Sequence, residues 1–131
     1  MIITEKNYVE KAEAAIQLHK NKINEKTKKK KPMVTTSKIR NLLSMTADIC
    51  NEVMDCKEEK LNDELCGRID YLKVRVLYEA GREPVVREFV EDTNMLKCIS
   101  EIGGSKKNYL LFSRYMEALV AYHRFYGGKD N

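Results

Sequence analysis

The sequence contains few residues that break helices. Its 131 residues include only two prolines and six glycines, against 43% hydrophobic residues, and tryptophan is absent. This composition favours a compact helical protein over a disordered or all-β one, and the length fits a single domain, residues 1–131. No segment alternates polar and apolar residues for long enough to predict a β-strand.

Long apolar runs are also missing. No run has the length needed to span a membrane. The amino-terminal stretch MIITEKNYVEKAE carries charge where a signal peptide needs an apolar centre. These absences predict a cytoplasmic protein that makes no membrane contact.

Residues and motifs for catalysis are scarce. The sequence has no P-loop, no GxSxG nucleophile elbow and no HExxH zinc helix. His19 and His123 are the only histidines, and His123 lies in an apolar segment, where a hydrogen-bonded core histidine is the commoner role. The four cysteines form no CxxC pair, which favours buried reduced thiols over a zinc site. We therefore expect no enzyme activity, no cofactor and no catalytic or metal-binding residues.

The helical spacing of apolar residues predicts five helices. In the last of them, from Asn108 to Gly128, apolar side chains cover most of the circumference, so other helices must bury it. The narrow polar stripe of this segment consists of Ser113, Arg114, Glu117 and Arg124. The first helix should begin at Thr4 or Tyr8 and end at Asn24. The other four expected ranges are 36–54, 55–80, 85–102 and 106–126. The fold class we predict is all-α, a compact five-helix bundle with a basic flexible linker at residues 25–34.

Local signals set the expected helix ends. Asn7 and Asp55 each stand three residues before a glutamate, which is capping-box spacing and places a tight break between the second and third helices. Ser105 can cap the last helix. Gly81 can take the left-handed conformation that ends a helix, and the glycine pair at 103–104 should stop the fourth helix.

The third helix has a second apolar face, formed by Tyr71, Val74, Leu77 and Tyr78. This face can be covered by the first helix or by a neighbouring copy of the chain. If the isolated protein leaves it exposed, we expect self-association, with a homodimer as one form.

The net charge of +4 is unevenly distributed. Residues 1–35 hold nine lysines against four glutamates, whereas the rest of the chain holds 15 basic and 16 acidic residues. The excess is concentrated in the run around Lys28 to Lys31, which can bind any polyanion but is more often a solvated linker. The overall charge therefore says little about the folded body.

A stripe of arginines marks the third helix. Arg68, Arg75 and Arg82 recur every seven residues, a repeat of about 10.5 Å along a helix. Tyr71 and Tyr78 lie about 40° further round the same helix. Arginines hold phosphates and aromatic rings stack on bases, so this pattern suits single-stranded nucleic acid.

The same stripe also has a purely structural interpretation. Glu64 and Glu79 have the spacing to pair with Arg68 and Arg75 on the helix surface. In that case the two tyrosines belong to the core.

Two further helix starts carry basic pairs. Lys38 and Arg40 open the second helix, and Lys106 and Lys107 open the last, where free backbone amides attract a phosphate. Arg114 can bind a phosphate or pair with the glutamate three residues on. An ordinary solvated turn is the alternative for each pair.

Four blocks of sequence make a more restrictive pattern when taken together. They are NYVEKAEAAI (7–16), TTSKIRNLLSM (35–45), YLKVRVLYEAGRE (71–83) and RYMEALVAYHRFYGGKD (114–130). In this order, and over nearly the full length, the chain resembles the Csm small subunit of type III-A CRISPR effector complexes.

The resemblance implies a five-helix protein with no active site of its own. Copies of such a subunit stack along the backbone subunits that hold the guide RNA, and a basic face binds the sugar-phosphate backbone of target RNA paired with the guide, in antiviral defence. The implied partners are target and guide RNA, the other Csm subunits and further copies of the chain. The basic residues inside the matching blocks are Lys38, Arg40, Lys73, Arg75, Arg82, Arg114 and Lys129.

Two other classes of function stay open. A helix-turn-helix DNA-binding regulator is suggested by TTSKIRNLL, although a lysine-rich linker precedes it where that motif needs a packed helix and a tight turn. A structural helical adaptor with internally paired arginines would make no salt-dependent contact with nucleic acid.

Overall fold

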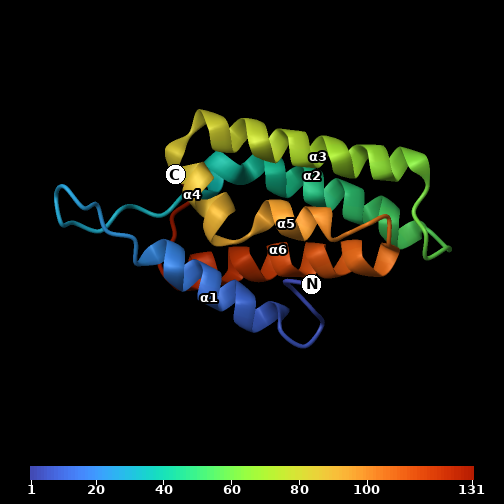
Figure 1. Ribbon diagram of the computed structural model, residues 1–131, viewed down its shortest axis with the longest axis horizontal. Helices are drawn as coiled ribbons and strands as arrows, with labels where there is room; N and C mark the ends of the chain where they lie inside the picture. The colour runs from blue at the N-terminus through green and yellow to red at the C-terminus, as the bar shows by residue number, and fades with distance from the viewer.

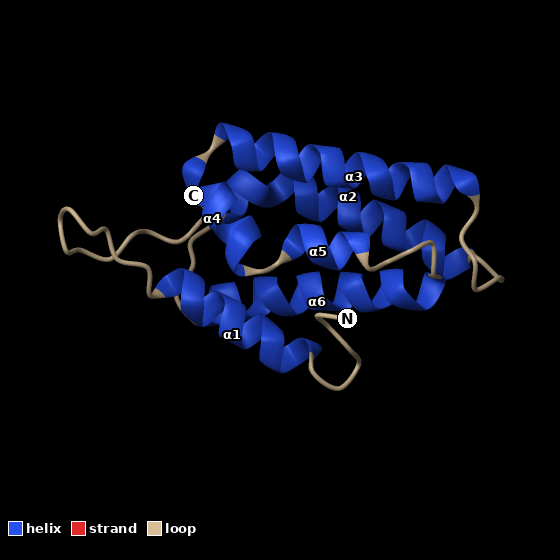
Figure 2. Ribbon diagram, in the orientation of Figure 1, coloured by secondary structure: helices blue, strands red, loops and turns tan.

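The computed structural model describes residues 1–131 and contains six α-helices and no β-strand (Figures 1 and 2). The helices are α1 (Tyr8–Lys20), α2 (Thr36–Asp55), α3 (Asp63–Arg82), α4 (Pro84–Asp92), α5 (Met95–Ser100) and α6 (Lys106–Phe125). The prediction of an all-α fold is confirmed, with six helices in place of five. None of them combines the length and the apolar character needed to cross a membrane.

The helices close a ring around one core. Helix α2 packs between α3 and α6, α3 packs on α4 and α5, and α1 joins α4 to α6. Figure 1 shows α2, α3 and α6 as long, roughly parallel rods, with α1 along the outer side of α6. Because α2 runs antiparallel to both long neighbours, its first residues meet the end of α3 and the end of α6.

Helix α6 supplies the largest buried side chains, as its apolar pattern predicts. Tyr109 and Tyr115 are almost completely buried, and their hydroxyls donate to the carbonyl oxygens of Thr46 (2.7 Å) and Thr93 (2.8 Å). These bonds tie α6 to α2 and to the end of α4 at the points where a buried phenol needs a partner. The predicted polar stripe is wrong at Ser113, which is buried.

The break between α2 and α3 is a loop of seven residues, not the tight break predicted at Asp55. Asn62 is the true N-cap, and its side chain accepts a hydrogen bond from the amide of Leu65 (2.9 Å). Leu61 is buried and its amide donates to the carbonyl of Gly104 (2.8 Å), which pins the loop to the start of α6. The prediction for Gly81 is also wrong, since it lies inside α3 without a positive φ.

The predicted fourth helix is divided into α4 and α5. Asn94 adopts the left-handed conformation (φ 54°), and the Thr93 hydroxyl bonds back to the carbonyl of Phe89 (2.8 Å). Serine, threonine and asparagine compete in this way with the helical hydrogen-bond ladder, and here the competition turns the chain. The glycine pair at 103–104 ends α5 with φ of 56° and 74°, and Ser105 caps α6 by accepting from the amide of Asn108 (3.1 Å), both as predicted.

The first helix is shorter than predicted, because it ends at Lys20 and the following lysine-rich segment forms a hairpin-like turn. Within this turn the amide of Lys31 donates to the carbonyl of Lys22 (2.8 Å), and the Asn24 side chain accepts from two amides. Asn7 makes no capping bond to α1. It bonds instead to Thr4 in both directions (2.7 and 3.2 Å). The flexibility of residues 25–34 stays a prediction.

The carboxyl-terminal tail caps α2. The amides of Thr36 and Ser37 donate to the carbonyl oxygens of Lys129 (3.1 Å) and Asp130 (2.8 Å). Gly127 turns the tail with a φ of 94°. The segments TTSKIR and FYGGKD, which belong to two of the sequence blocks, therefore form one structural unit, although they lie 90 residues apart in the chain.

Candidate nucleic-acid interface

On α3, two of the striped arginines share one buried carboxylate. Glu79 is only 4% exposed and accepts from Arg75 (3.2 Å) and Arg82 (3.3 Å). The Tyr78 ring lies under both guanidinium groups, at 5.0 Å from Arg75 and 5.9 Å from Arg82. Two arginines share one glutamate, so the cluster keeps a net positive charge. The ion pairs and the Tyr78 ring hold the two guanidinium groups in place. The pairing of Arg75 with Glu79 confirms that part of the structural interpretation.

The third arginine of the stripe pairs across helices. Arg68 donates to the carboxylate of Glu52 on α2, so the expected pairing with Glu64 is wrong. Tyr71 lies beside Arg68, along a small hollow between α2 and α3. Lys73 faces another neighbour, the hydroxyl of Ser100 at the end of α5 (3.1 Å).

The amides at the start of α2 are not free, which corrects the prediction of open amides at this helix start. The tail carbonyls occupy them, and the Lys38 side chain pairs with Glu83 (3.2 Å). Arg40 is exposed and forms no ion pair or hydrogen bond with its side chain. The hydrogen bond from Arg124 lowers the pKa of Asp130 on the tail, and the charge of Arg40 adds to this effect.

The amides at the start of α6 are also taken. Glu59 accepts from the amide of Lys107 (3.0 Å) and from the Ser105 hydroxyl (2.6 Å) through its carboxylate, and its carbonyl accepts from the amide of Lys106 (2.8 Å). The Ser105 bond, followed by the Lys107 amide, lowers the pKa of Glu59. Glu59 of the protein thus occupies these amides, so the expectation of free amides at this helix start is wrong, whereas phosphate contact by the lysine side chains stays a prediction.

The side chains around this helix start differ in their freedom. Lys106 donates to the carbonyl of Cys56, whereas Lys107 and Arg114 are exposed and have no partner. The alternative pairing of Arg114 with Glu117 does not occur. Lys106, Lys107 and Arg114 line one open hollow of about 320 Å³.

The predicted basic residues therefore do not form one continuous track. Lys38, Arg40 and Arg82 gather where α2 begins and α3 ends, and Lys107 and Arg114 lie toward the other end of the bundle. A helix of 20 residues separates the two groups by up to about 30 Å. Among the nine candidates, only Arg40, Lys107 and Arg114 are exposed and have a side chain without an ion pair or hydrogen bond.

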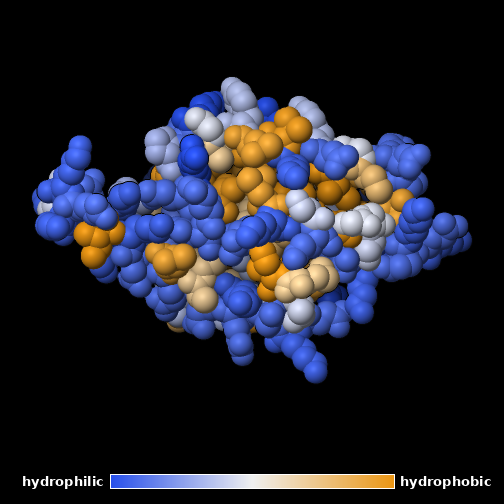
Figure 3. Space-filling view, viewed as in Figure 1, coloured by the Kyte–Doolittle hydropathy of each residue, from blue (hydrophilic) through white to orange (hydrophobic).

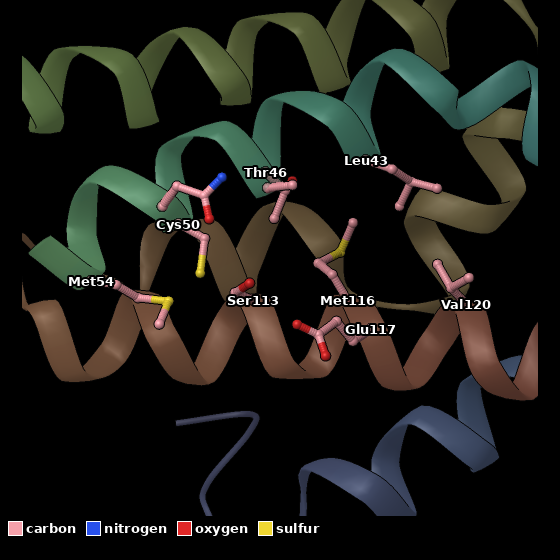
Figure 4. A pocket seen from close by; sticks show the side chains of 10 residues that line it. Leu43, Thr46, Cys50, Met54, Ser113, Met116, Glu117 and Val120 are labelled. Atoms are coloured by element: carbon pink, nitrogen blue, oxygen red, sulfur yellow. The ribbon is translucent and has the colours of Figure 1, made fainter.

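An apolar groove of about 470 Å³ lies between α2 and α6 (Figure 4). Figure 4 shows Leu43, Cys50 and Met54 of α2 facing Met116 and Val120 of α6. The surface view likewise shows apolar atoms gathered in patches over α3 and α5, among mostly hydrophilic ones (Figure 3). No three His, Cys, Asp or Glu side chains converge in a way that could hold a metal ion.

Sequence reasoning missed Glu59 and the tail carbonyls. Glu59 lies 46 residues from Ser105 and 48 residues from Lys107, the two residues that it binds. No local sequence pattern predicts a contact between residues so far apart. The tail had one available signal, because the glycine pair at 127–128 follows an otherwise uninterrupted helix.

The fold and this surface define a class: a small all-helical protein with exposed basic side chains and no metal-binding cluster. Comparison with known proteins then places it more narrowly. The sequence matches the family model for Csm2 Type III-A over residues 10–129.

Individual relatives agree with the family match. The CRISPR system Cms protein Csm2 of Streptococcus thermophilus is 44% identical over 129 residues, 98% of each chain. Proteins of the same name are 36% identical over 130 residues in Mycobacterium tuberculosis (strain CDC 1551 / Oshkosh), 99% of each chain, and 40% identical over 95 residues in Enterococcus italicus, 71% of this chain and 68% of that one. The chain belongs to the Csm2 family, the small subunits of type III-A CRISPR systems, which confirms the resemblance seen in its sequence blocks.

Proposed function

We propose that this protein is a non-catalytic subunit of a type III-A effector complex in the cytoplasm, where it binds the sugar-phosphate backbone of target RNA paired with guide RNA. Family membership supports the complex, and the free cations Arg40, Lys107 and Arg114 support the backbone contact. Base pairing with the guide RNA recognises the target sequence, and the protein binds the phosphates whatever the sequence is. The outcome for the cell is antiviral defence.

The nine candidate residues take different parts in this proposal. Arg40, Lys107 and Arg114 reach phosphates directly, because their exposed side chains form no ion pair within the chain. Arg82 and Lys38 flank Arg40 and exchange Glu79 and Glu83 for phosphate oxygens when RNA arrives. The side chains of the other four candidates already bind partners within the protein, so they contribute only to the positive electrostatic potential of the surface. These four are Arg68, Lys73, Arg75 and Lys106.

The proposal includes stacking of copies through the outer face of α3. Tyr71, Val74, Leu77 and Tyr78 are each 51–57% exposed on this face. Helix α1 packs on α6 and α4, so it does not cover them. The sequence suggested that either the first helix or a neighbouring copy covers this face, and only the neighbouring copy remains. Burying this face would provide the hydrophobic contribution to association.

The helix-turn-helix alternative receives no support from the geometry. Fifteen residues separate α1 from α2, and the carboxyl-terminal tail sits on the first amides of α2. A recognition helix needs a short turn after a packed helix and an N-terminus that is open to the groove of DNA. The adaptor alternative differs in predicting no salt-dependent RNA contact at all.

The RNA contact is tested in the assembled complex with neutralised variants. Arg40→Ala with Arg82→Ala removes two phosphate contacts, and the slope of log affinity for single-stranded target RNA against log salt concentration falls by about 0.7 per contact. The matched control is Arg87→Ala, an exposed arginine of α4 that pairs with Glu91 and lies outside both groups. Unchanged RNA capture and an unchanged slope in the double variant would remove the assigned phosphate role.

Self-association is tested on the isolated chain. Leu77→Glu puts a charge in the middle of the α3 face, so sedimentation velocity should show a shift toward monomer. Leu18→Glu on α1 is the matched control, because Leu18 is exposed to a similar extent (55% against 51%) and lies elsewhere. Equal association of both variants and the parent chain would exclude this face as the contact between copies.

A further inference from the structure

Two histidines hold one backbone unit from opposite sides. The amide of Val34 donates to Nε2 of His19 (3.0 Å), and the carbonyl of Val34 accepts from Nε2 of His123 (2.6 Å). All three residues are at most 3% exposed. We call this set, His19, Val34 and His123, the histidine clasp; it joins α1 and α6 to the residue that ends the lysine-rich hairpin.

The clasp accepts only one protonation state of His19. Nε2 of His19 accepts a hydrogen from Val34, so the single ring proton must lie on Nδ1, which contacts Oδ2 of Asp92 (3.1 Å). A neutral imidazole has one donor and one acceptor, and both are used here. His123 is different, because the Nε2–H that it donates is present in its neutral and in its charged form.

The hairpin has two further tethers, both to α4. The Lys22 ammonium lies 3.0 Å from Oδ1 of Asp92, and the Lys31 ammonium lies 2.6 Å from Oε1 of Glu88. Residues 25–30 between these tethers are exposed and include Lys26, Lys28, Lys29 and Lys30. The position of these lysines on the molecule therefore depends on the clasp and on two ion pairs.

We infer that His19 is a protonation-sensitive latch: adding a proton at its Nε2 puts two N–H donors face to face and releases Val34, with the hairpin of residues 21–34, from α1 and α6. The proton comes from solvent and stays on the ring, and no covalent bond changes. This device is independent of the RNA-binding proposal.

The charges around His19 act in opposite directions. From α4, Asp92 and Glu88 favour the protonated ring, whereas His123 from α6 disfavours it. From the hairpin, the ammonium groups of Lys22 and Lys31 are paired with those same carboxylates. Burial is the largest effect, and it lowers the pKa of His19 below its ordinary value of 6.5.

The sign of the pH dependence follows from this lowered pKa. Well above pH 6.5 the ring is neutral whether the clasp is open or closed, and the clasp has its full stability. As the pH falls below 6.5, the open form binds a proton at Nε2, which the closed clasp excludes, so acid favours opening. Protection of the clasp thus falls with pH by up to about tenfold per pH unit in that window.

The test is native-state hydrogen exchange of the full chain, read by NMR as the protection factor of the Val34 amide between pH 8 and pH 5, with the His19 ring proton followed in the same samples. Loss of Val34 protection as the pH falls below 6.5, while the amides of α6 stay protected, is the expected result. Constant Val34 protection through that titration would overturn the inference, and so would loss that occurs only together with the α6 amides.

A variant provides an independent check. His19→Gln keeps a group that can accept from Val34 but cannot be protonated in this range, so its Val34 protection should be independent of pH. If the variant retains the pH dependence of the parent, His19 is not the latch. Because the titration of the unaltered protein decides the question alone, the inference stays testable even if this variant folds poorly.

Discussion

Replacing Gly128 by alanine tests how tightly the tail and the histidine clasp are packed together. A Cβ on Gly128 would lie 2.2 Å from Cε1 and 2.4 Å from both ring nitrogens of His123. These distances are far inside van der Waals contact, and the ring cannot swing out freely because His123 is 3% exposed and bonded to Val34. Either the tail or the ring must move.

Both movements cost stability. Over-packing of a well-packed site costs about 1–3 kcal/mol. Displacement of the ring also breaks the buried bond to Val34, which adds about 1 kcal/mol. We therefore expect Gly128→Ala to lower the free energy of unfolding by about 2–4 kcal/mol, which at an m-value of about 2 kcal/mol/M moves the urea midpoint down by about 1–2 M.

Urea unfolding followed by circular dichroism measures this shift, with Gly67→Ala as the matched control. Gly67 lies in α3, and a Cβ there meets nothing within 4 Å. The control should gain about 0.5–1 kcal/mol, because alanine loses less backbone entropy in a helix. A Gly128→Ala midpoint equal to that of the parent chain would refute the packing argument.

Two further outcomes follow from buried groups. Tyr109→Phe removes the hydroxyl that donates to the carbonyl of Thr46 and should cost about 1–2 kcal/mol in the same urea assay, with no change in m-value; a loss of less than ~0.3 kcal/mol would mean that this bond contributes nothing net. Burial raises the pKa of the Cys98 thiol to about 12, so in a kinetic assay with a thiol reagent at pH 8 three cysteines should react in the folded protein and Cys98 only on unfolding; four equal rates would contradict its burial.

The sequence predicts the elements of this fold better than their ends. The apolar pattern of α6 identifies the helix that the others surround, and Ser105 marks its start correctly, because both signals are local. The errors at Asp55 and Gly81 share one cause: several residues nearby could cap or end a helix, and distant contacts decided between them. Leu61, held by the carbonyl of Gly104, is such a contact.

The candidate site shows the same limit. Residue type and spacing identify the exposed cations, and the pairing of Arg75 with Glu79 one turn away is visible in the sequence. The sequence does not show that the amides at the start of α2 and α6 are hydrogen-bonded, because their acceptors come from the far end of the chain or from another loop. Long-range partners thus decide which basic residues stay free.

The most direct measurement is a tagged pull-down of this chain from cells that produce the other Csm subunits, with the bound proteins and RNA identified by mass spectrometry and sequencing. We expect a large particle that contains several copies of the chain, the other subunits and RNA of guide length. Recovery of the chain alone and free of RNA, with all partners expressed, would contradict its role as a subunit of the RNA-guided complex.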